Sequence, residues 1–71
     1  GGMYSKVFTA YNNSVDIFFV PYMEDVEGYT TNYEDAMRAY DVLGRPESMK
    51  IVPVKTFHDA IKYLESLNNG V

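Results

Sequence analysis

Two segments of the chain repeat one pattern, in which a short run of β-branched and aromatic residues reaches a proline and a helical periodicity follows. The first run is VDIFFVP (15–21) and the second is MKIVPV (49–54). Such runs are typical of buried strands, and proline closes a strand because it has no N–H to donate to the ladder. The sequence therefore predicts strands over residues 15–20 and 50–54.

A helical stripe follows each of these strands. Apolar side chains recur every three or four residues over 33–43 and again over 57–67, which is the spacing of one helix face. Thr31 and Glu34 have the spacing of a capping box at the start of the first helix, and Gly44 can end it in a left-handed conformation. We therefore expect two amphipathic helices of similar design.

The order strand, helix, strand predicts a crossover that makes the two strands parallel. The N-terminal segment YSKVFTAY (4–11) is interpreted as a third strand, and the short NNS turn after it would make that strand antiparallel to its neighbour. The predicted fold is α/β, with α+β as the alternative, in the order β-β-α-β-α. It has a three-stranded mixed sheet with two helices on one face. The uncovered face would expose aromatic side chains, so we expect a protein partner or a homodimer.

Length and composition restrict the class of protein. A chain of 71 residues makes one small domain, over residues 3–71, and Gly1 and Gly2 are interpreted as the remnant of an expression tag. The net charge of −4 and the scattered basic residues argue against a nucleic-acid partner. There is no cysteine, so disulfides and thiolate metal sites are excluded. No run is apolar enough for a membrane span, and we expect a cytoplasmic protein with no membrane partner.

The segments VDIFFVPYMEDV (15–26) and MKIVPVKTFHDAIKYLESL (49–67) resemble the C-terminal part of Lon-type (S16) protease domains and their non-proteolytic relatives. In that family a buried strand ends in proline, and a last strand leads through a Ser or Thr into a closing helix. The family's Glu-Asn pair after the strand proline is absent here, where Tyr22 and Met23 follow Pro21. Its catalytic serine and lysine lie upstream of the similar segment. The resemblance therefore implies the scaffold of that family without its catalytic residues.

Polar residues follow the carboxyl ends of the two parallel strands, over 21–32 and 53–56. Ligands of open parallel sheets collect at this edge, and the free amides at helix N-termini attract anions. Lys55, Thr56 and His58 are therefore the candidate residues for binding a small ligand or anion, and Thr56 is also a candidate N-cap.

The longer of the two connections is rich in acids and tyrosines. Its candidate interaction residues are Tyr22, Glu24, Asp25, Glu27 and Tyr29, because a tyrosine ring can anchor a protein contact. The three acids have oxygen ligands for a divalent ion, but their spacing is not that of a calcium loop, so a solvated acidic loop is favoured and no metal is predicted.

The sequence favours a non-catalytic module for protein interaction or self-association. The alternative is a regulatory domain that binds a small ligand, an anion or a divalent ion at the strand-end edge. No catalytic residue and no cofactor is predicted, because His58 is the single histidine and no partner for general acid-base chemistry is evident beside it. The sequence does not favour an enzyme.

Overall fold

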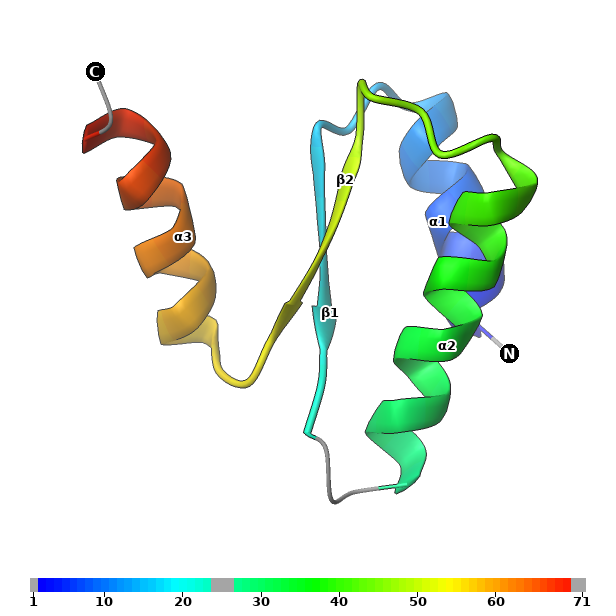
Figure 1. The fold of residues 1–71 in the computed structure, drawn as a ribbon, viewed down its shortest axis with the longest axis horizontal. Coiled ribbons are helices and arrows are strands. Elements are labelled where there is room, and N and C mark those ends of the chain that lie inside the picture. Colours follow the sequence, from blue (N-terminus) through cyan, green and yellow to red (C-terminus); the bar gives the residue numbers. More distant parts are fainter. Residues whose placement is uncertain (1, 24–26, 70–71) are drawn as a thin grey trace.

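The computed structural model describes the backbone of residues 2–23 and 27–69, and the side chains of residues 2–23 and 31–68. The described chain runs α1 (Gly2–Asn12), β1 (Ile17–Pro21), α2 (Glu27–Val42), β2 (Lys50–Val54) and α3 (Phe57–Asn69). The sheet is at the centre of Figure 1, with α1 and α2 on one face and α3 on the other. The described part of the chain therefore has three helices and two strands, in three layers.

The prediction of a strand over residues 4–11 is wrong, because this segment forms α1. Its apolar residues recur at the helical spacing rather than in alternation. Val7 and Ala10 are buried, and Tyr4 and Phe8 pack against the same core with their ring centroids 5.1 Å apart. The NNS segment is accordingly not a hairpin turn. The predicted three-stranded mixed sheet is therefore wrong as well. The prediction that the two helices after the strands share one face is also wrong, because α2 and α3 lie on opposite faces of the sheet.

Helix α1 ends in a Schellman motif that has serine at the left-handed position. Ser14 has a φ of 60°, the amide of Val15 donates to the carbonyl of Ala10 at 3.0 Å, and the amide of Ser14 donates to that of Tyr11 at 3.1 Å. These are the two bonds of the motif, which is usually built on glycine. The chain thereby turns from α1 into β1 at a residue whose side chain disfavours the turn.

Strands β1 and β2 are parallel, as predicted, and Phe19 pairs with Val52 at the middle of the register. Side chains alternate between the two faces of the sheet. Phe18 and Val20 of β1 belong to the core between the sheet and the α1–α2 layer. Phe19 points to the other face, where its ring packs edge-on against the ring of Tyr63 of α3, with ring centroids 5.9 Å apart.

Helix α2 is the crossover between the strands, and it begins at Glu27 rather than near residue 33. Thr31 is therefore inside the helix and does not cap it. Half of the predicted polar connection over 21–32, residues 27–32, is therefore helix. The end of α2 is as predicted: Gly44 has a φ of 83°, and the amide of Arg45 donates to the carbonyl of Tyr40 at 3.0 Å.

The core lies between the sheet and the α1–α2 layer. Its buried residues are Val7, Ala10, Val20, Ala36, Ala39 and Met49. Alanines let α2 approach its neighbours closely, and Met49 is the largest of the fully buried side chains. The core is thus one-sided, because only Ala60 is buried among the described side chains of α3.

Substitutions at the two left-handed helix ends should change the stability in opposite directions. Gly44→Ala should lower the free energy of unfolding by about 1 kcal/mol, because alanine disfavours positive φ, while the space around its Cβ is open. Ser14→Gly should raise the free energy of unfolding by about 0.5–1 kcal/mol for the same reason. Urea denaturation followed by circular dichroism measures both. Equal signs for the two variants would contradict the left-handed assignment at one of these positions.

Candidate functional site

An apolar groove lies between α3 and the sheet face opposite the core. The groove has a volume of about 430 Å³ and a mostly apolar lining. The lining residues are Phe19, Pro21, Val54, Lys55, Thr56, Phe57, Ala60, Ile61 and Leu64. It exists because α3 approaches the sheet near its own first turn and then diverges from the strands, as Figure 1 shows.

One side of α3 exposes large apolar side chains along most of its length. We call Phe57, Ile61, Leu64 and Leu67 the α3 stripe; their exposed fractions are 81%, 38%, 40% and 48%. The sequence periodicity identifies these residues as one helix face, and the structure shows that this face is exposed. An apolar helix face without a cover is uncommon on a monomeric protein and marks an interaction surface.

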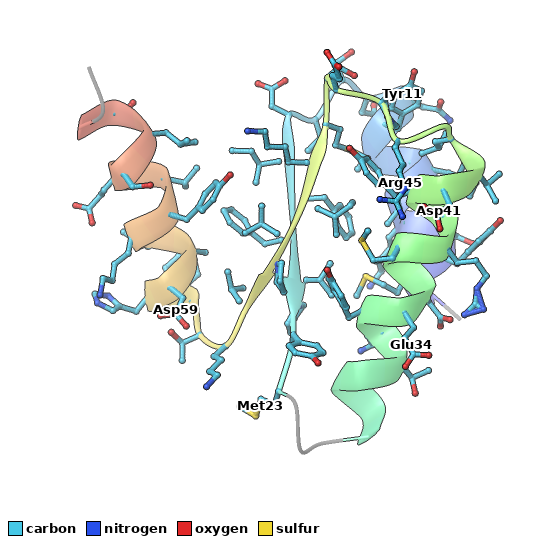
Figure 2. The ribbon with its side chains drawn as sticks, in the orientation of Figure 1. Tyr11, Met23, Glu34, Asp41, Arg45 and Asp59 are labelled. Atoms are coloured by element: carbon cyan, nitrogen blue, oxygen red, sulfur yellow. The ribbon has the colours of Figure 1, made fainter. Side chains whose placement is uncertain are left out.

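The position of α3 is set at its first turn by a capping box. The amide of Asp59 donates to the hydroxyl oxygen of Thr56 at 3.1 Å, and the amide of Thr56 donates to the carboxylate of Asp59 at 3.3 Å. The amide of Lys55 donates to the same carboxylate oxygen at 3.3 Å. Thr56 is therefore an N-cap as predicted, and Figure 2 shows Asp59 at the turn where β2 leads into α3.

The candidate anion residues, Lys55, Thr56 and His58, lie together at this turn, and all three are exposed. Asp59 already supplies a carboxylate to the amides of Lys55 and Thr56. An anion that approached these amides would meet that negative charge. Anion binding here stays a prediction that no other feature of the turn favours.

The candidate interaction residues are only partly within the described structure. Tyr22 is half-buried and packs against Tyr33 of α2, with ring centroids 5.1 Å apart. Its amide also extends the ladder by donating to the carbonyl of Val54 at 2.9 Å. The side chains of Glu24, Asp25, Glu27 and Tyr29 lie outside the described residues. Tyr22 therefore contributes to the fold, and its role in a contact stays a prediction.

Other kinds of site find little support in the described part of the chain. No three His, Asp or Glu side chains gather there as metal ligands do. A second hollow, at the amino ends of the strands, lies between Tyr11, Asp16 and Ser48, and Figure 2 shows Tyr11 near this end. The described helices are also too short or too polar to cross a membrane.

Sequence reasoning missed the groove for a physical reason. The strands and the helix that line it were predicted, but their relative placement depends on how many strands the sheet has. The apolar spacing of Val7, Ala10 and Tyr11 was the available signal, because it is helical and removes the third strand. With two described strands in the sheet, α3 is the one described helix on its face.

The capping box predicts a local loss of stability. Thr56→Ala should lower the free energy of unfolding by about 1 kcal/mol, because it removes the acceptor for the amide of Asp59, whereas Thr56→Ser keeps a hydroxyl and should change it by less than about half of that. Urea denaturation gives the free energies. An alanine variant as stable as the wild type would show that the box does not hold the start of α3.

Comparisons with family models, curated proteins and solved structures find no match to this chain. The similarity of residues 15–67 to Lon-type protease domains stays a prediction from the sequence. The function is accordingly argued from the geometry of the groove and the α3 stripe.

Proposed function

We propose that this chain is a non-catalytic interaction module that binds a protein partner, or a second copy, through the groove and the α3 stripe. The observation that carries the proposal is the exposure of four large apolar residues along α3, which lies on the sheet face opposite α1 and α2. Burial of such surface is the main driving force of protein association.

The overall dimensions support the proposal. The accessible surface is 5004 Å², compared with about 4,500 Å² expected for a folded monomer of this mass. The radius of gyration is 12.4 Å, compared with about 11 Å for a compact domain of this length. Both values are larger than expected for a compact monomer, so the chain leaves more of its surface exposed than such a monomer does.

The distribution of charge also suits an apolar contact on this side. Residues 50–69 have a net charge of +1, from Lys50, Lys55 and Lys62 with Asp59 and Glu65. Because the whole chain has a net charge of −4, residues 1–49 have a net charge of −5. The acidic character is thus concentrated away from α3. A partner of either sign can approach the α3 stripe without strong repulsion.

The proposal predicts a difference between two variants of equal charge change. The double variant Ile61→Glu with Leu64→Glu places two carboxylates in the α3 stripe, and Lys62→Glu changes the net charge by the same amount outside it. We expect the double variant to bind the apolar dye ANS several-fold more weakly than the wild type, and to lose any concentration-dependent rise in mass. Lys62→Glu should resemble the wild type in both measurements.

The measurements are dye fluorescence and sedimentation equilibrium, with circular dichroism to confirm that α3 persists. Because Ile61 and Leu64 are exposed, their replacement should change the free energy of unfolding by no more than about 1 kcal/mol. Equal dye binding by the double variant and by Lys62→Glu would remove the α3 stripe as the contact surface.

A further inference from the structure

The two edges of the sheet differ in what they offer to another strand. The amide of Lys50 donates to the carbonyl of Asp16, and the amide of Tyr22 donates to that of Val54, both at 2.9 Å. Because N–H groups alternate between the two sides of a strand, even-numbered residues of β1 point their amides toward β2. The amides and carbonyls of Ile17 and Phe19 therefore point away from β2, at the outer edge of β1.

Within the described part of the chain, no hydrogen bond is found to the outward amides of Ile17 and Phe19. The outer edge of β2 is poorer in donors. Pro53 has no N–H at its centre, and the amide of Lys55 is already bonded to Asp59. The open edge of β1 is thus the better template for an added strand.

The helix layer above the core is wider than the sheet that it covers. Two neighbouring strands span about 10 Å and two packed helices about 20 Å. Helix α2 packs over both strands, and α1 packs along α2. In Figure 1, α1 lies behind α2, and β1 lies behind β2. Helix α1 therefore lies on the side of α2 toward the outer edge of β1.

The outer edge of β1 lies near apolar side chains of both helix layers. Tyr4 and Phe8 of α1 pack against the core that contains Val20 of β1, and Phe19 of β1 lines the groove under α3. Charges are scarce there: β1 has none over Ile17–Pro21, and Lys6 is the single charge of α1. A strand that is buried on both faces is apolar throughout rather than alternating.

A second copy of this chain does not fit at the outer edge of β1. Pairing β1 with β1 of another copy requires a two-fold axis perpendicular to the sheet. Such an axis places the α1 helices of both copies on the same side of the joined sheet, where the two helices would overlap.

We propose that the outer edge of β1 binds an extended apolar segment of a partner protein, which adds to the sheet as a third strand between α1 and α3. The inference rests on the proposed function and identifies the kind of partner for the same side of the molecule. The amides of Ile17 and Phe19 donate hydrogen bonds to the backbone of the segment, and the apolar side chains near β1 favour apolar side chains in it.

The test is an NMR titration of the ¹⁵N-labelled chain with the synthetic peptide KKVIVFVKK. Saturable binding should slow the hydrogen exchange of the Ile17 and Phe19 amides by at least tenfold, and leave that of Phe18 and Val20, which already face β2, unchanged. The peptide KKVPVPVKK, in which proline removes alternate donors, should not bind. Absence of binding by KKVIVFVKK, or binding without protection of these two amides, would overturn the inference.

Two variants separate the edge from the groove. Ile17→Pro removes an outward amide without removing a bond to β2 and should weaken peptide binding at least tenfold, whereas Ile17→Val keeps the amide and should bind within about twofold of the wild type. If Ile17→Pro binds normally while Ile61→Glu with Leu64→Glu does not, edge docking is wrong and the proposed function stands. If protection of Ile17 and Phe19 rises with protein concentration in the absence of peptide, the occupant is a second copy and the inference is wrong.

Discussion

The parallel pairing of β1 with β2 requires the chain to travel back along the whole sheet between the two strands, and α2 is that return path. The hydrophobic core depends on this connection. Val20 of β1 faces Ala36 and Ala39 of α2 within one core, and the buried Met49 immediately precedes β2. Helix α1 adds Val7 to the same core by packing along α2 rather than over the strands.

The same arrangement leaves the molecule unequal on its two sides. Two helices cover one face of a sheet that has two described strands, and a single diverging helix stands over the other. Purely parallel sheets are normally buried on both faces and extend to more strands. The exposed α3 stripe and the open edge of β1 are therefore two consequences of one cause, a sheet narrower than the helix layers around it.

The sequence predicts the elements of the crossover well and their surroundings poorly. The parallel strands, the glycine at the end of α2 and the Thr56 cap follow from local chemistry, and the structure has each of them. Residues 4–11 were misassigned because Val7, Phe8 and Tyr11 have high strand propensity one by one, although their spacing is helical. The helical period outweighs the strand propensity in this segment, and the predicted third strand is therefore absent from the described sheet.

The candidate site could be predicted only in part, for a related reason. The apolar stripe of α3 can be predicted from the spacing of the residues from Phe57 to Leu67. Such a stripe indicates that the helix packs against another surface, but not whether that surface belongs to the same chain. The outward direction of the Ile17 and Phe19 amides depends on register, which is fixed by pairing between strands far apart in sequence. Such information is tertiary, and no local pattern contains it.

Amide hydrogen exchange of β1 in the free protein tests the account most directly. Because the ladder to β2 uses the amides of Phe18, Val20 and Tyr22, these should exchange slowly, while the intervening amides of Ile17 and Phe19 should exchange at least a hundredfold faster, as expected for donors without a partner. This alternation along one short strand would establish both the parallel register and the open edge. Slow exchange at Ile17 and Phe19 as well, in a dilute sample of the isolated chain, would contradict it.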